Sequence, residues 1–358
     1  MLLNLKNVVQ NILGITKIIL INLLIFFLIL AIFELFLGKW FKNDFKYKLS
    51  SERNIDRVYK LNFEYHKGTS HYIKNNYGFR INNDDTNFNP STIDIVFAGG
   101  STINQKFINF DDTIVGILAK KNKNLKMANS GVDGMSIKGH INSFKFWFNK
   151  IKNLKPKYFI YLLGINDRYL IEKYAFRDNV DNLEESSFKG NLREYLESNS
   201  FFYTRGRKLK SLLYLKYKLE IGTKKVKLNH VYLDRDKNEF ISYEEVKKNF
   251  TKLNKNKKIK YLEFEKWYLN QLKILTDLIY KVDALPIFIT QTTGYGHSFE
   301  SFIVARTIIK HCNINNLPCL NLAKDLNLKY EDFYDEIHLN IIGSKKMAEY
   351  IYANISIF

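Results

Sequence analysis

The sequence of 358 residues contains only 4 prolines and 2 cysteines. So few prolines exclude long proline-rich linkers between domains. The two cysteines, Cys312 and Cys319, do not have the spacing of a metal site. They could form a disulfide, but two small buried hydrophobic side chains are the favoured interpretation. The cysteines therefore leave the cellular compartment open.

Acidic residues are scarce relative to basic ones, since 36 Asp and Glu face 55 Lys and Arg and leave a net charge of +19. The lysines are spread along the whole chain among many Asn and Ile residues, as in a protein from an AT-rich genome. We therefore predict no nucleic-acid partner. The lysines within residues 208–218 and 224–227 could instead meet anionic lipid or an acidic glycan, although a solvated charged face is the favoured interpretation.

A long apolar run near the N-terminus, Ile18 to Leu37, is interrupted only by Asn22 and Glu34. Its length matches the roughly 20 residues that a membrane-spanning helix needs. No small-residue cleavage site follows, and the aromatic and basic residues 38–42 resemble an interfacial anchor. We predict an uncleaved signal anchor that makes the chain a single-pass membrane protein. Lysines flank both ends of the run, so charge does not fix its orientation.

Composition divides the chain into a short N-terminal tail (1–17), the transmembrane anchor (18–38), a polar stalk with a lead-in segment (39–90) and a domain over 91–358. Hydrophobic residues make up 46% of the chain, enough for one large α/β domain with extras or two smaller ones. Residues from about 170 to 262 are charged and aromatic with helical stretches. They predict a mostly helical insertion, either a lid or a peripheral decoration.

The domain alternates between short apolar runs and helical patterns. Because strands separated by helices form parallel sheets with right-handed crossovers, we predict an α/β fold. Ligand sites in such sheets lie beyond the carboxyl ends of the strands. The five predicted strands are residues 93–98, 125–129, 158–163, 284–290 and 317–322, and the main helical patterns are residues 113–121, 137–151 and 341–355.

Four short polar blocks lie where such a sheet would place a site. Three of them follow or end a predicted strand, and the fourth precedes the C-terminal helical pattern. Because the carboxyl ends of parallel strands meet at one edge, we expect the four blocks to line one cleft. They are Phe97-Ala98-Gly99-Gly100-Ser101-Thr102, Asn129-Ser130-Gly131-Val132-Asp133-Gly134, Gly164-Ile165-Asn166-Asp167 and Asp335-Glu336-Ile337-His338-Leu339-Asn340.

The residue types in these blocks suit nucleophilic catalysis. A serine hydroxyl is a poor nucleophile until a base takes its proton, and His338 could be the base for Ser101. Asp335, three residues before His338, could fix the imidazole tautomer and stabilise the imidazolium. The oxyanion could receive hydrogen bonds from the backbone N–H groups of Ser101 and Gly134 and from the side-chain amide of Asn166.

The order Ser, Gly, Asn, His resembles the SGNH hydrolases, also called GDSL-type esterases. Ser101 matches the first block of that family, Gly134 the second, Asn166 the third, and Asp335 with His338 the fifth. The resemblance implies a flavodoxin-like three-layer α/β/α sandwich and ester hydrolysis with neither a cofactor nor a metal. It covers roughly the first three and the last two of the predicted strands and leaves the insertion unmatched.

The first block departs from the Gly-Asp-Ser of the family, since Gly100 stands where Asp is usual. Gly-Gly-Ser-Thr, like the earlier Asn76-Tyr77-Gly78-Phe79-Arg80, resembles the membrane-anchored bacterial members. By analogy with them, we predict that the domain lies outside the cytoplasm, in the periplasm or at the cell surface. The predicted reaction removes an O-acyl group, above all O-acetyl, from a cell-surface polysaccharide or an acylated small molecule.

Two alternatives to an esterase stay open. An O-acyltransferase would use the same residues, with a sugar hydroxyl in place of water. A non-catalytic membrane-anchored module that binds glycan or assembles a surface complex would need neither the serine nor the histidine, and both are present.

Residues 234–245 resemble an EF-hand calcium loop. Glu239 occupies the position where glycine normally makes the sharp turn. An accidental match in a chain rich in Asp, Asn and Lys is therefore favoured over a calcium site. The residues at ligand positions are Asp234, Asp236, Asn238, Ser242 and Glu245.

Overall fold

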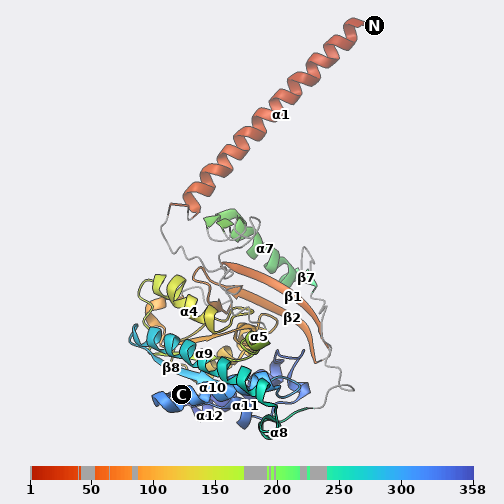
Figure 1. Cartoon of the computed structure of the whole chain (residues 1–358). Helices are drawn as coiled ribbons and strands as arrows, with labels where there is room; N and C mark the ends of the chain where they lie inside the picture. Colours follow the sequence, from red (N-terminus) through yellow and green to blue (C-terminus); the bar gives the residue numbers. More distant parts are fainter. Residues whose placement is uncertain are drawn as a thin grey trace.

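The computed structural model shows an α/β domain with a long N-terminal helix that projects away from it (Figure 1). Five strands of the domain are parallel neighbours in the order β5-β4-β6-β8-β9. This is the flavodoxin-like order 2-1-3-4-5, so the predicted fold class is confirmed. The structure describes residues 2–38, 40–41, 53–63, 65–82, 88–172, 192, 195–196, 199–217, 224–225 and 240–358.

The five parallel strands follow the predicted apolar runs. All five residues of the first one, β4, are buried, as expected of a strand covered on both faces. Each strand is shorter than its apolar run because the strand includes only the residues that pair with a neighbouring strand through backbone hydrogen bonds. The bounds are Ile95–Gly99 for β4, Met127–Asn129 for β5, Tyr158–Leu162 for β6, Leu285–Ile289 for β8 and Cys319–Leu320 for β9.

Helices cover both faces of the parallel strands, and alternate residues of β4 show it. Val96 packs in one apolar cluster with residues of α4, α9 and α10. Phe97 packs in another, with residues of α3 and α12. This is the predicted three-layer sandwich. The helices are α3 (Ile114–Lys121), α4 (Ile137–Phe146), α9 (Lys255–Tyr280), α10 (Phe299–Asn315) and α12 (Ile341–Asn354).

The sheet does not end at β5, and here the structure differs from the predicted stalk and lead-in segment over residues 39–90. Within the described residues, β7, β1, β2 and β3 continue it to nine strands. A third apolar cluster, which includes Tyr59, Leu61 and Phe63, anchors β1 to the domain. Polar residues alternate with these side chains, a pattern typical of a half-buried strand, and the prediction of a polar stalk was wrong because it considered only the overall polarity of the segment. The four strands are β1 (Ile55–Phe63), β2 (His66–Lys74), β3 (Arg80–Ile81) and β7 (Lys224–Lys225).

The N-terminal helix, α1 (Leu2–Leu37), takes in most of the predicted tail as well as the predicted anchor. Its segment Leu13–Leu37 has a mean hydropathy of 2.9 and none of it is buried. This length and composition fit a membrane span and a signal sequence alike.

The described part of the predicted insertion is mostly helical, as expected, but its predicted end at residue 262 falls inside α9. That helix is the crossover between β6 and β8 and packs on α4 and α10, so it belongs to the domain's outer layer. The remaining helices are α2 (Ser101–Asn104), α5 (Arg168–Glu172), α7 (Phe201–Tyr217), α8 (Tyr243–Phe250), α11 (Leu322–Asp325), η1 (Pro90–Thr92), η2 (Phe110–Asp112), η3 (Phe148–Lys150) and η5 (Tyr330–Asp332).

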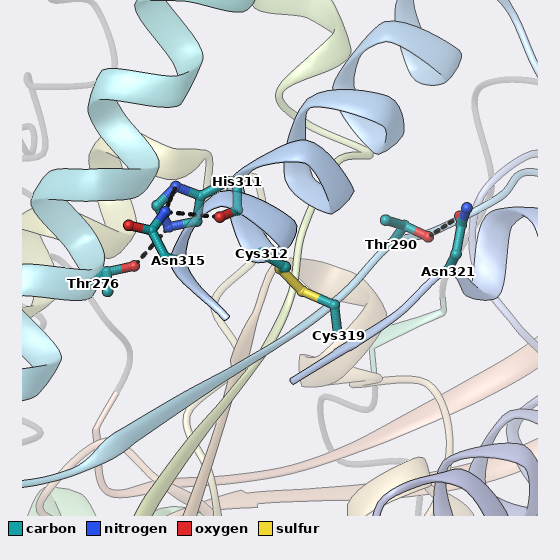
Figure 2. Close-up of a disulfide and its surroundings, with 7 residues drawn as sticks. All are labelled: Thr276, Thr290, His311, Cys312, Asn315, Cys319 and Asn321. Atoms are coloured by element: carbon teal, nitrogen blue, oxygen red, sulfur yellow. Dashed lines mark hydrogen bonds between the residues drawn. A yellow bond between two sulfur atoms is a disulfide. The ribbon is translucent and has the colours of Figure 1, made fainter. Parts of the chain in front are cut away.

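Cys312 and Cys319 form a disulfide, which corrects the favoured interpretation of two separate buried thiols (Figure 2). Cys312 lies in the last turns of α10 and Cys319 begins β9. Asn316 ends the helix in the left-handed conformation, with φ of 52°. The chain therefore reverses, and the two Cα atoms lie 6.3 Å apart. The spacing of seven residues did not reveal this reversal.

Candidate active site

Ser101 lies at the carboxyl end of β4, as predicted. It is the first residue of the short helix α2, and Gly100 precedes it as the N-cap. A Cβ atom on Gly100 would lie 2.6 Å from Nδ2 of Asn166. The amide of Asn166 therefore occupies the space that a side chain on residue 100 would take, at the position where the SGNH hydrolases that the sequence resembles usually have aspartate.

His338 and Asp335 come from the loop before α12 and meet Ser101 there. The Nε2 atom of His338 lies 2.7 Å from Oγ of Ser101, and its Nδ1 atom lies 2.6 Å from Oδ2 of Asp335. The other carboxylate oxygen of Asp335 accepts hydrogen bonds from the backbone N–H groups of Ile337 and His338 at 2.9 and 2.7 Å. These bonds hold the carboxylate in the turn, with its second oxygen directed at the imidazole.

Tyr334 supports the imidazole from its flat side. The two rings are stacked, with centroids 5.5 Å apart and planes 9° from parallel. Tyr334 is buried in the apolar cluster beside β1 and β2. The added strands therefore contribute to the site, because they back the ring on which His338 rests. The contribution of these strands was not predicted, since their residues were assigned to a stalk.

The structure also brings Asn166 and Gly134 to the strand end where Ser101 lies. The side-chain amide of Asn166 donates to the carbonyl of Met135 at 2.9 Å and lies beside Gly100. Gly134 directly precedes Met135 and has a φ of 75°, a left-handed conformation that favours glycine. Among the described residues, leaving aside Gly134 and its two chain neighbours, no heavy atom lies within 4 Å of the position a Cβ on Gly134 would take, so its backbone borders open space.

Asp167, the last residue of the third block, is a buried structural carboxylate. It accepts hydrogen bonds from the backbone N–H of Ile137, the first residue of α4, at 2.7 Å and from that of Gly164 at 3.1 Å. Burial raises the pKa of Asp167 from 3.8 to about 6. It therefore fixes the loop that presents Asn166 to the beginning of α4.

Arg168 ties the loop of Asn166 to the loop of His338. Its guanidinium lies 2.8 Å from Oε1 of Glu336, between the two members of the Asp–His pair in sequence. It also stacks over the ring of Tyr169 at 4.8 Å from the centroid. Arg168 and Glu336 are near the predicted site residues Asn166 and Asp335 in sequence, but nothing in the spacing of the two residues indicated that they form an ion pair.

Arg80 ends the segment Asn76-Tyr77-Gly78-Phe79-Arg80, and its structural role was not predicted from the sequence. Arg80 is buried in β3, and its guanidinium donates to the backbone carbonyls of Asn104, Gln105 and Ile108. Burial lowers its pKa to about 10, which leaves it charged at neutral pH. These three carbonyls belong to the turn that follows Ser101, so Arg80 holds the end of α2 in place.

The predicted calcium loop lies mostly outside the described residues. Of its ligand positions, the structure describes Ser242 and Glu245. The hydroxyl of Ser242 accepts a hydrogen bond from the backbone N–H of Glu245 at 3.2 Å and caps α8. This cap uses the backbone N–H of Glu245 and not its carboxylate, and the accidental match at residues 234–245 stays a prediction.

No protein-family model matches the chain, and no curated protein matches it. Among solved structures, it is similar to a lipolytic protein of the G-D-S-L family from Veillonella parvula, with 11% identity over 74% of this chain and 98% of the other, at a TM-score of 0.41. It is also similar to an acetyl xylan esterase from Geobacillus stearothermophilus, with 13% identity over 73% and 94%, at a TM-score of 0.38. At such scores the likeness alone decides neither family nor activity.

Proposed function

We propose that this protein is a membrane-anchored serine esterase of the SGNH type. The observation that supports this best is the unbroken chain of short contacts from the hydroxyl of Ser101 through the imidazole of His338 to the carboxylate of Asp335. Ser101 at the start of α2 and His338 lie 237 residues apart in sequence, and together with Asp335 they can act as a nucleophile, a base and a group that orients the base.

In the proposed reaction, Nε2 of His338 takes the proton of Ser101 as the hydroxyl oxygen attacks the ester carbonyl. The imidazolium then gives this proton to the leaving alcohol, and an acyl-serine remains. Water, deprotonated by the same imidazole, then attacks the acyl group. The bond between the acyl carbon and Oγ of Ser101 breaks, the imidazolium returns the proton to Oγ, and the acid leaves. Throughout, Asp335 keeps the N–H of the imidazole on Nδ1, since its carboxylate accepts that hydrogen.

The oxyanion formed in each step would lie between the backbone N–H groups of Ser101 and Gly134 and the amide of Asn166. An amide nitrogen carries two hydrogens, and Asn166 uses one of them to bind Met135. That bond aims the second hydrogen without consuming it. A donor held in this way needs no reorganisation when the negative charge appears.

We propose that the substrate is an O-acyl group, above all O-acetyl, on a cell-surface glycan. An apolar N-terminal helix keeps the domain at a membrane, where such glycans are built and displayed. The disulfide between Cys312 and Cys319 supports a domain outside the cytoplasm, because disulfides persist in oxidising compartments. Single-pass topology with the domain on that side satisfies both observations.

A fluorophosphonate probe tests the nucleophile directly on the full chain in detergent. We expect the probe to label the wild type at Ser101 and to leave Ser101→Ala unlabelled, with hydrolysis of p-nitrophenyl acetate reduced at least about 10³-fold. Ser91→Ala, an exposed serine in η1, is the matched control and should behave as wild type. Full activity in Ser101→Ala would exclude the proposal. Release of free acetate from an acetylated glycan would distinguish a hydrolase from a transferase.

A further inference from the structure

Helix α7 presents an exposed apolar face although it packs on the sheet. Its residues Phe202, Leu209, Leu212 and Tyr217 are 41–58% exposed. They recur at helical spacing, so they share one side of the helix. Ser211, on the opposite side, is buried, and α7 contacts β1. Four large apolar side chains on one free face mark an interaction surface.

The same face is cationic. Arg205, Lys210 and Lys216 are exposed between the apolar side chains, and residues 201–217 include no acidic residue. The guanidinium of Arg205 lies over the ring of Phe201 and the ammonium of Lys216 over that of Tyr217, at 5.5 and 5.2 Å from the centroids. Large apolar groups with interleaved Lys and Arg are typical of helices that lie in the interface of a bilayer.

Glu34 of α1 fixes where α7 begins. Its two carboxylate oxygens accept hydrogen bonds from the backbone N–H groups of Phe201 and Phe202 at 2.8 and 2.9 Å. One of them also accepts from the indole of Trp40 at 3.0 Å. A carboxylate at a helix N-terminus satisfies N–H groups that have no partner inside the helix. The one acidic residue of the apolar run therefore joins the end of the anchor to α7.

The arrangement of the two helices matches the geometry of a membrane surface. The N-terminus of α7 lies at the end of α1 that is nearest the domain, and in Figure 1 α7 runs across the direction of α1. A bilayer that surrounds α1 would end near Trp40, an aromatic residue of the kind enriched at membrane interfaces. Helix α7 would then lie along that interface, between the bilayer and the sheet.

We propose that α7 is a second membrane contact, whose exposed face lies in the headgroup layer of a bilayer that contains anionic phospholipid. The apolar side chains enter the outer acyl region, and Arg205, Lys210 and Lys216 bind lipid phosphates. The domain is thereby fixed against the membrane rather than left to swing on the anchor. This inference depends on α1 as a membrane span but not on the proposed esterase chemistry.

Depth-dependent fluorescence quenching in nanodiscs tests the contact on the full chain. The two native cysteines are joined, so an introduced cysteine is the single thiol that bimane can label. In phosphatidylcholine–phosphatidylglycerol discs with lipid spin-labelled near the headgroup, we expect bimane at Leu209→Cys to lose at least about half its fluorescence. Bimane at Ile342→Cys, an exposed position of α12, should lose almost none. An equal fractional loss of fluorescence at positions 209 and 342 would overturn the proposal.

Two further variants test the parts of the proposal separately. Bimane at Leu24→Cys, an exposed position of α1, should be quenched by lipid spin-labelled deep in the acyl chains. The absence of this quenching would overturn the membrane anchor on which the inference depends.

The triple variant R205Q/K210Q/K216Q should weaken quenching at position 209 at least about twofold. The matched loss of charge on α9, K255Q/K257Q/K266Q, should not change it. Unaltered quenching in the first triple variant would exclude the role of anionic lipid.

Discussion

Gly100 and Asn166 lie so close that the side-chain amide of Asn166 occupies the position that a side chain on residue 100 would take. A Cβ atom on Gly100 would be 2.6 Å from Nδ2 of Asn166, closer than real Cβ atoms approach other atoms. Nδ2 is the end of a side chain, so the amide of Asn166 would move before the backbone did. Any residue larger than glycine at position 100 would therefore displace the proposed oxyanion donor.

Gly100→Ala should lower kcat for p-nitrophenyl acetate by about 10²-fold with little change in the melting temperature, since the loss of one oxyanion donor has an effect of this size. Steady-state kinetics measure kcat, and thermal unfolding measures the melting temperature. Gly206→Ala, on α7, is the control, because a Cβ there meets no atom within 4 Å. Wild-type kcat in Gly100→Ala would show that the position of Asn166 does not matter for the reaction.

Asn166→Ala removes the amide itself. We expect kcat to fall by about 10²–10³-fold while KM changes little, because the oxyanion exists only in the transition state and intermediate. The exposed Asn249 of α8 provides a matched Asn→Ala control. A rise in KM alone would assign Asn166 to substrate binding.

Asp335→Asn retains the shape of the turn but removes the charge beside His338. An asparagine can still accept from the N–H groups of Ile337 and His338, but its amide would face Nδ1 and favour the wrong imidazole tautomer. We expect kcat/KM to fall by about 10³–10⁴-fold at neutral pH. Asp283→Asn, in an exposed turn with φ of 58°, should have no effect because asparagine tolerates that conformation. Equal activity of the two variants would contradict the role of Asp335.

Asp167 makes the stability of the domain depend on pH. Its pKa is about 6 in the folded chain and 3.8 without burial, so the folded state binds the proton more tightly. The stability this provides is complete below pH 3.8 and is lost as pH rises through 6, by about 3 kcal/mol at most. Urea unfolding at pH 4 to 7 should show a steeper loss of stability in wild type than in Asp167→Asn. Parallel curves would mean that Asp167 stays ionised when folded.

The disulfide is testable by chemistry and by stability. Iodoacetamide should not modify the protein when it is unfolded without reductant, and should modify two thiols after reduction. We expect Cys319→Ser to lower the free energy of unfolding by about 2–3 kcal/mol, because the disulfide closes a short loop of the unfolded chain. Ser298→Thr, which retains the hydroxyl that caps α10, serves as a control at the other end of that helix. Two reactive thiols in the unreduced protein would exclude the disulfide.

The sequence by itself determined the parts of this protein that depend on local pattern. Apolar runs of five to seven residues between helical patterns define five parallel strands, because such strands are buried on both faces. The placement of Ser101, Asn166 and His338 at strand ends or before the last helix follows from the same pattern. Their approach within one cleft then follows from the geometry of parallel sheets.

Tertiary structure alone decided the features that depend on distant partners. Strand β1 needs β2 as its hydrogen-bonded partner, and Tyr334 packs with its buried side chains. Arg80 binds carbonyls 24 to 28 residues away, which no spacing rule connects to it. The pairing of Cys312 with Cys319 needed the reversal at Asn316, and the contact of Glu34 with α7 spans 167 residues. Each of these interactions forms between segments that only the folded backbone brings together.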